Sequence, residues 1–267
     1  MSNTIYSNFY LANEIEDLYA SHLALQNRVT VRNDLVGRAG MTYVVNKYTA
    51  TSGAEVVALG SGNTQDVEVS YTPASYTIQC VQARAPFYDE EALTDPVAID
   101  VLNQKLAADM FDAVNTDIYT ELLTTTNSVS AATPDFNAFV DAQAILNLEN
   151  LENVEQFAYV NPVDVAKIRK AAGASLQYTE RFIRQGYVGT IAGINLYTKK
   201  NATAKTIVIA TREACTLFNK SGVEVEAVVK GNRSIADANT RSNTIYARKY
   251  YVAALTDASK AVKIILP

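Results

Sequence analysis

The sequence has 267 residues, of which 48% are hydrophobic and 19% charged, and its formal net charge is −5 at pH 7. This length allows one large domain or two closely packed ones. Proteins that hold nucleic acid tightly use clustered Lys and Arg, whereas the basic residues here form only short groups, which excludes a strong grip on DNA or RNA. No apolar run approaches the ~18–20 residues that a membrane helix needs, and the acidic first 20 residues predict no export signal.

Residues that commonly perform catalysis are scarce. The single histidine, His22, lies in an expected N-terminal helix, and we interpret it as a helix-face or interface residue. One histidine and two distant cysteines, Cys80 and Cys215, cannot build a typical zinc site, and both cysteines are expected to be reduced thiols. The acidic groups at 89–91 and 149–155 suit helix ends or solvated faces. The sequence therefore predicts no enzyme and no catalytic, cofactor-binding or metal site.

Two glycine-rich stretches lack the signatures of nucleotide-binding loops. Gly60-Ser-Gly62 has neither a third glycine nor the Gly-Lys-Ser/Thr ending of a phosphate loop. It lies between two strand-like runs, so a hairpin tip is expected. The stretch from Gly186 to Gly193 precedes a strand, whereas a dinucleotide fingerprint follows a strand and begins a helix.

Residues 1–36 are expected to form an arm. Its apolar face falls on helical spacing and consists of Leu11, Ile15, Leu18, His22 and Leu25. A short amphipathic helix of this kind is expected to dock on its own domain or on a neighbour.

Residues 41–85 are rich in predicted strands, and these are expected at 41–48, 55–59, 67–71 and 76–84. The alternation of apolar and polar residues from Val67 to Tyr71 is typical of a half-buried strand. The second and third runs flank the glycine tip, so the segment is interpreted as a long two-stranded excursion from one sheet. Because an isolated hairpin is only marginally stable in water, this excursion is expected to lie on a neighbour.

A long helix is predicted next, with Asp95 as its N-cap and Pro96 in its first turn. Its apolar residues recur every four positions: Leu102, Leu106, Met110, Val114, Ile118 and Leu122. A spacing of four drifts by about 40° per step against a 3.6-residue turn, so the apolar stripe winds around the helix. The two ends of the helix are therefore expected to meet different partners.

The remainder is predicted to alternate helix and strand before it returns to strands. Helices are expected from Asp135 or Asn137 through Leu148 and over residues 162–172, the latter burying Val163, Ala166, Ile168 and Ala171. Strands or short segments are expected at 157–160, 194–198, 206–210, 214–219, 223–229, 244–254 and 261–266.

This order of elements resembles the HK97-type major capsid proteins of tailed phages. Local strings carry the same likeness, namely Tyr159-Val-Asn-Pro162, the stretch from Gly186 to Leu196, the stretch from Ile207 to Ala214, and Val223-Glu-Val-Glu-Ala227 with Arg233 and Asp237. The likeness covers nearly the whole chain and implies an α+β fold with four parts. These are an N-terminal arm at 1–36, an E-loop hairpin at 47–77, an A-domain at 135–225, and a P-domain at 37–46, 78–134 and 226–267 that contains a spine helix at about 96–124.

The resemblance also implies a function. Such a subunit would be a structural virion protein that self-assembles through pentamers and hexamers into an icosahedral-type phage head around double-stranded DNA, without sequence-specific DNA binding. It would be made in the host cytoplasm and would associate with a portal and with no membrane. The expected subunit contacts are Glu55, Gly60, Gly62, Asp66 and Glu68 in the E-loop, and Arg181 and Arg184 in the A-domain.

Two departures from the family limit what can be carried over. The namesake family member joins an E-loop lysine covalently to an asparagine, whereas here Lys47 stands at the base of the loop and no lysine occurs from 48 to 104. No such crosslink is therefore expected. Residues 1–36 are too short for the cleaved assembly domain of some relatives, so a separate scaffolding protein is expected.

Three alternatives stay open at this point. An encapsulin-like compartment has the same fold and encloses enzymes instead of a genome. A soluble α/β enzyme is a second alternative, disfavoured by the lone histidine and the missing motifs. A phage tail or head-completion protein is a third, disfavoured by the long helix together with the long hairpin.

Overall fold

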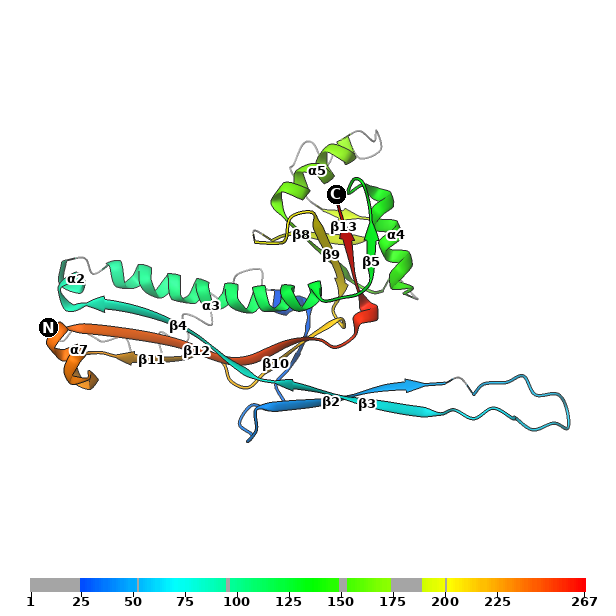
Figure 1. Cartoon of the computed structure of the whole chain (residues 1–267), viewed down its shortest axis with the longest axis horizontal. Coiled ribbons are helices and arrows are strands. Elements are labelled where there is room, and N and C mark those ends of the chain that lie inside the picture. Colours follow the sequence, from blue (N-terminus) through cyan, green and yellow to red (C-terminus); the bar gives the residue numbers. More distant parts are fainter. Residues whose placement is uncertain (1–24, 52, 95–96, 149–152, 174–188, 200) are drawn as a thin grey trace.

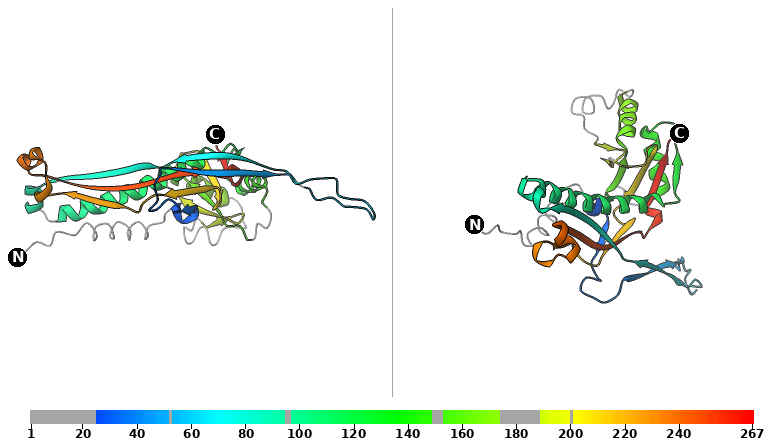
Figure 2. Two further views of the ribbon diagram at one scale, coloured as in Figure 1. Left: turned by 90° about the horizontal axis from the view of Figure 1, so that it is seen from below. Right: turned by 60° about the vertical axis from the view of Figure 1, so that its left-hand side comes forward.

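The computed structural model describes residues 25–51, 53–94, 97–148, 153–173, 189–199 and 201–267. These residues form three visible parts: a long twisted sheet with a helix along it, a compact unit at one end, and a hairpin that projects past that end (Figure 1). The view from below shows the hairpin extending well beyond the rest of the chain (Figure 2).

The long sheet is organised around β12 (Ser242–Leu255). One edge of β12 pairs with β4 (Gln79–Tyr88), and the other pairs first with β11 (Glu224–Val228) and then with β10 (Cys215–Asn219), all antiparallel. The short strand β1 (Thr30–Arg32) adds to β10 in parallel. Along β12, every second residue from Asn243 to Tyr251 is buried, as expected where a helix covers one face of a sheet.

The helix on this sheet is α3 (Val97–Leu123), preceded by α2 (Asp89–Thr94). At about 1.5 Å per residue, the 27 residues of α3 span about 40 Å. Leu106 and Met110 pack with residues of β4 and β12, such as Phe87 and Ile245, whereas Ile118 and Leu122 pack in a separate cluster nearer the compact unit. The winding stripe and its two different sets of partners are therefore confirmed.

The compact unit contains a six-stranded sheet with the order β5-β13-β9-β6-β8-β7. Its strands are β5 (Ser128–Ser130), β6 (Gln156–Val160), β7 (Thr190–Ile191), β8 (Ile194–Thr198), β9 (Thr206–Thr211) and β13 (Ala261–Ile265). One face of the sheet is covered by α4 (Phe136–Leu146) and α5 (Pro162–Gly173), which share a cluster with Ala158, Val160 and Ile207. Asp135 caps α4 by accepting a hydrogen bond from the Ala138 amide, as its position predicts.

Smaller elements complete the described chain. The 3-10 turn η1 (Leu25–Arg28) reaches α3, where the Leu25 amide donates to Oδ1 of Asn115 at 2.8 Å. The hairpin is formed by β2 (Thr42–Ala50) and β3 (Val69–Thr77). A 3-10 turn η2 (Lys230–Asn232) and the helix α7 (Ile235–Thr240) lie at the far tip of the long sheet, and η3 (Ala258–Lys260) links β12 to β13.

Several sequence-based boundaries are wrong, each for a non-local reason. The run at 76–84 is two strands, since β3 and β4 are separated at Ile78, whose amide donates to the Met41 carbonyl at 2.7 Å. Residues 55–59 form no strand. In α5 the buried residues are Asp164, Val165 and Ile168, whereas Val163 and Ala166 are exposed.

Strand partners cross the expected limits of the A-domain. β10 lies inside the range 135–225 yet pairs in the long sheet, and β5 and β13 lie outside that range yet pair in the compact sheet. Three connections therefore pass between the two units: from α3 to β5, from β9 to β10, and from β12 to β13. The division of the chain into four parts stays a prediction.

Candidate assembly surfaces

The base of the hairpin is fixed to the long sheet by aromatic contacts. The rings of Tyr43 on β2 and Tyr76 on β3 lie 4.5 Å and 5.4 Å from that of Phe218 on β10, measured between centroids. The Tyr43 hydroxyl donates to Oδ2 of Asp34 at 2.5 Å. These contacts hold the base while the rest of the hairpin extends away from the body (Figure 2).

Beyond the strands, the loop from 51 to 68 is held by its own hydrogen bonds. The Thr51 amide donates to the Glu68 carbonyl at 2.9 Å, and the Glu68 amide donates to the Thr51 hydroxyl at 2.9 Å. Nearer the tip, Oε2 of Glu55 accepts from both the amide and the hydroxyl of Thr64, at 3.0 and 3.1 Å. The described residues of the loop are thus organised by hydrogen bonds within the loop itself.

Glycines shape this loop at two positions. Gly60 has φ of +89°, and the turn there is closed by the Ser61 amide donating to the Ala58 carbonyl at 3.0 Å. Gly62, which we also expected to serve the turn, has no positive φ. Gly53 was not predicted from the sequence; an added Cβ there would lie 2.6 Å from a methyl carbon of Val67, so the two sides of the loop meet at this point.

The hairpin exposes apolar side chains along most of its length, namely Val44, Val56, Val57, Leu59, Val67, Val69 and Tyr71. Val56 and Leu59, near the tip, are essentially fully exposed. Fully burying one side chain of this size contributes about 1.5–3 kcal/mol relative to leaving it in water. An apolar surface this extended on a projecting element marks an interaction site.

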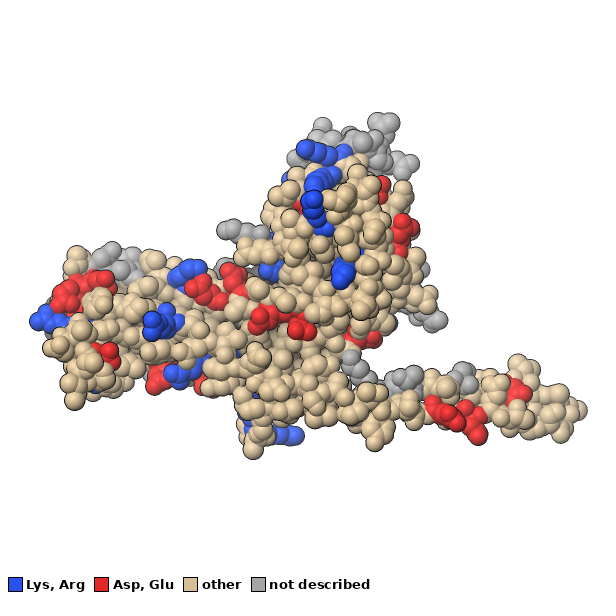
Figure 3. Space-filling model, viewed as in Figure 1, with Lys and Arg blue, Asp and Glu red and all other residues tan. Residues whose placement is uncertain are grey.

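All charged residues of the hairpin loop are acidic. Residues 48–77 contain Glu55, Asp66 and Glu68 and neither Lys nor Arg. None of these three acids forms a salt bridge within the described chain. The space-filling view shows acidic side chains on the projecting hairpin without basic ones beside them (Figure 3). The hairpin therefore offers an acidic and apolar surface.

Comparison with known proteins shows which proteins are similar to this chain in sequence and fold. No protein-family model matches the sequence. The chain is 27% identical over 241 residues to the "Major capsid protein" of Staphylococcus phage phiMR11, covering 88% of this chain and 84% of that protein. The mature capsid of bacteriophage PhiM1 has a TM-score of 0.70 at 9% identity, covering 92% of this chain and 87% of that one. The capsid of Cyanophage P-SCSP1u has a TM-score of 0.66 at 12% identity, covering 90% and 86%.

The chain has the HK97-type fold of major capsid proteins. The sequence-based expectations of an α+β, HK97-like fold and of a capsid shell protein are thereby confirmed. A similar fold occurs in a virus-like particle from Pyrococcus furiosus, with a TM-score of 0.66 at 12% identity, covering 95% of this chain and 97% of that one.

The chain has a second organised surface at the opposite end of its long sheet, next to α2 and α7. Arg233, whose side chain is 7% exposed, donates from Nη2 to Oδ1 of Asp89 at 2.6 Å and from Nε to Oδ1 of Asn243 at 3.0 Å. Nδ2 of Asn243 donates to the same Asp89 oxygen at 2.9 Å. This network joins α2, β12 and the segment before α7. Hydrogen bonds from Arg233, and then from Asn243, lower the pKa of Asp89 to about 2.

We predict that this network makes the free energy of unfolding depend on pH in the acidic range. The unfolded pKa of an aspartate is about 3.9, so the unfolded chain binds the proton more tightly than the folded chain. The stabilisation is complete above about pH 4 and is lost as the pH falls through the folded pKa of about 2. Urea midpoints of the wild type and of Asp89→Asn should differ most above pH 4 and converge near pH 2. Asp100→Asn, an exposed change in α3, is the control, and a difference that stays constant with pH would contradict the prediction.

Of the other residues singled out in the sequence, three lie outside the described part of the chain and two are cysteines. His22, Arg181 and Arg184 lie outside the described residues. Cys80 is exposed on β4, whereas Cys215 is buried, and burial raises the pKa of its thiol to about 12. In the described part of the chain, no helix is long and apolar enough to cross a membrane, and no three His, Cys, Asp or Glu residues gather as metal ligands would.

Proposed function

We propose that this chain is the major shell subunit of a phage head, where it self-assembles through pentamers and hexamers around double-stranded DNA. Its curated relative is named a major capsid protein, and its fold is that of phage capsid subunits. The role is structural, in the virion, after synthesis in the host cytoplasm. The net charge of the chain is −5, so the subunit encloses DNA without sequence-specific binding.

The observation that carries this proposal is the projecting hairpin. Its base is held by aromatic rings, its loop is closed by internal hydrogen bonds, and apolar side chains near its tip, Val56 and Leu59, are essentially fully exposed. Exposing this apolar surface to water is energetically unfavourable. A second copy of the chain is the partner that is always present during assembly. Many such contacts, repeated around a closed shell, add up because each bound subunit raises the effective concentration of the next.

At the level of residues, Glu55, Asp66 and Glu68 of the hairpin would meet Lys or Arg of the neighbouring subunit. Each exposed ion pair contributes only about 0–1 kcal/mol, so these charges guide the contact while apolar burial supplies most of its energy. Glu55 also closes its own loop through Thr64, so its substitution would weaken the contact in two ways. Arg181 and Arg184 remain proposed contacts of the A-domain.

A separate scaffolding protein and a portal are proposed as further partners. The direct test is negative-stain electron microscopy of the purified chain, expressed alone and with its genomic neighbours. Uniform closed shells or five- and six-fold rings are expected, with better uniformity when a scaffolding protein is present. A monodisperse monomer in every preparation would overturn the proposal, and uniform shells from the pure chain alone would remove the need for scaffolding.

An encapsulin-like compartment is the second candidate, because the fold also matches that of the virus-like particle from Pyrococcus furiosus over nearly the full length of both chains. The content of shells purified from the native source distinguishes the two functions. Double-stranded DNA of uniform length supports a phage head. A protein cargo without nucleic acid supports a compartment.

We predict that mature shells contain no lysine–asparagine crosslink through the hairpin. The only lysine within the hairpin sequence is Lys47, which lies in the paired strand β2 and not in the loop at 51–68, and the next lysine along the chain is Lys105. Shells boiled in denaturant should run as a single monomer band on a gel. A ladder of covalent multimers that persists in reducing conditions would refute the prediction.

A further inference from the structure

Charge is strongly separated along the part of the sequence that runs from the middle of α3 through much of the compact unit. From residue 106 to residue 166 there are ten Asp and Glu and neither Lys nor Arg. From 167 to 205 there are eight Lys and Arg and a single acidic residue, Glu180. In the described chain, α4 lies in the acidic stretch, and α5 from Lys167 onward lies in the basic stretch. Figure 3, which has the view of Figure 1, shows acidic side chains on the flank where α4 lies and basic ones along α5.

The outer face of α4 combines apolar residues with one acid. Phe136, Val140 and Ile145 are 45%, 40% and 42% exposed, although they lie on a helix whose other face packs in the core. Asp141 is exposed beside them, one residue after Val140. Asp141 forms no ion pair with any residue in the described part of the chain.

The outer face of α5 has matching chemistry of opposite sign. Val163 is 62% exposed, and Lys170 is exposed two turns further along the helix without an ion pair inside the described ranges. Lys167, on the same helix, is instead engaged with Asp164, whose buried carboxylate lies 2.8 Å from its Nζ. Arg169 lies between these two lysines and also has an interaction of its own, whereas Lys170 is an exposed cation of α5 without an ion pair to any described residue.

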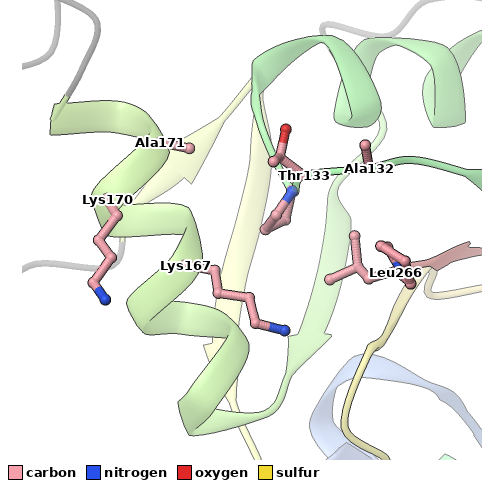
Figure 4. A pocket seen from close by; sticks show the side chains of 8 residues that line it. Ala132, Thr133, Lys167, Lys170, Ala171 and Leu266 are labelled. Atoms are coloured by element: carbon pink, nitrogen blue, oxygen red, sulfur yellow. The ribbon is translucent and has the colours of Figure 1, made fainter.

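A pocket of about 500 Å³ adjoins this face of α5. The close-up shows Lys167, Lys170 and Ala171 of α5 on one side and Ala132, Thr133 and Leu266 on the other (Figure 4). The pocket is therefore an apolar hollow beside two lysines. An apolar side chain that approaches with an acid next to it would fit both features.

We propose that, in a ring of these subunits, the α4 face of one copy packs on the α5 face and pocket of the next copy, with Asp141 opposite Lys170. A ring is built from heterologous contacts, in which one surface of each subunit meets a different surface of its neighbour. Two unlike faces with exposed apolar residues and opposite charge meet this requirement, whereas two like-charged faces would repel. This inference rests on the proposed function and identifies the surfaces through which rings form.

The test uses charge reversal in the full chain and exploits the direction of the contact. Asp141→Lys alone and Lys170→Glu alone each place like charges together at every ring contact. We expect each to raise the subunit concentration needed for half-maximal assembly by about threefold or more, measured by sedimentation velocity. The double variant Asp141→Lys with Lys170→Glu restores opposite charges and should assemble like the wild type.

Mixing the two single variants gives a sharper result. In an alternating ring, the new lysine on one subunit faces the new glutamate on the next, and the remaining Asp141 faces the remaining Lys170. Six-membered rings should therefore be restored by the mixture, whereas a five-membered ring must keep one mismatched contact. Electron microscopy of the mixture should show hexamers in excess over pentamers. A contact within one chain would not be rescued by mixing.

Two controls and two outcomes complete the experiment. Glu213→Lys and Arg212→Glu, on the turn after β9, reverse exposed charges away from both faces and should leave assembly unchanged. Melting temperatures of the monomers verify that every variant folds. Single variants that assemble like the wild type, or folded variants that neither the double change nor mixing restores, would overturn this inference alone. A wild type that never forms rings or shells would instead overturn the proposed function.

Discussion

Replacing residues 51–68 with a two-residue Asn-Gly turn between Ala50 and Val69 is expected to abolish shells and leave the folded monomer intact. Ala50 and Val69 are the last paired residues of the ladder, and Asn-Gly forms the tight turn that such a pair needs. The hydrogen bonds of the described loop residues are internal, so the hydrogen bonds of the body are expected to persist. Shortening a surface loop changes stability little, whereas removing the same interface from every subunit weakens the shell at every repeat.

Sedimentation velocity and electron microscopy measure this outcome, with the melting temperature of the monomer as the check on folding. We expect the yield of closed shells to fall by more than about tenfold, because the multivalent contacts fail together. A milder variant, Val56→Ser with Leu59→Ser, should give a shell yield between those of the wild type and the shortened chain. Ser61→Ala, at the same tip, should assemble normally. Normal shells from the shortened chain would show that the tip of the hairpin takes no part in assembly.

The second large effect is expected in the core beside α3. Ile118 is fully buried in the cluster that joins α3 to both sheets, where it lies among residues such as Leu217 and Tyr251. Ile118→Ala removes three carbons from this close-packed site and leaves a cavity. We expect the free energy of unfolding to fall by about 2–5 kcal/mol, measured by urea denaturation of the monomer.

The matched control lies on the same helix. Val101 is 57% exposed, so Val101→Ala should change the free energy of unfolding by less than about 0.5 kcal/mol. Equal losses of stability in the two variants would contradict the assignment of the buried stripe. A loss confined to Ile118→Ala would also predict fewer shells at elevated temperature, because less of the chain would be in the folded form that assembles.

Local signals in the sequence were sufficient for the elements that are regular and long. The four-residue spacing from Leu102 to Leu122 specified α3 and its winding buried face, and Asp135 marked the start of α4. Both depend on residues close together in the chain. The buried strand β6 was equally visible from its apolar run at 157–160, because a strand covered on both faces has a continuous apolar sequence, whereas burial of the polar Gln156 was not predicted.

Features that depend on distant partners could not be predicted. The division at Ile78 requires its bond to Met41, and the allocation of β10 and β13 to different sheets depends on pairing with strands far along the chain. In α5, burial of Asp164 is possible because its carboxylate accepts from the Lys205 amide at 2.7 Å, a partner that helical periodicity cannot reveal. The acidic residues of the hairpin were found from the sequence, whereas Gly53 and the exposed face of α4 were visible only in three dimensions.

The three connections between the long sheet and the compact unit have a mechanical consequence. Each is short: four residues separate α3 from β5, three separate β9 from β10, and five, including η3, separate β12 from β13. A pulling force between the two units is divided among three covalent links that act in parallel, and it is resisted by the cluster packed between them. The junction thus has no single hinge. Under internal pressure we expect a subunit to bend first along its hairpin, which is joined to the body only at its base.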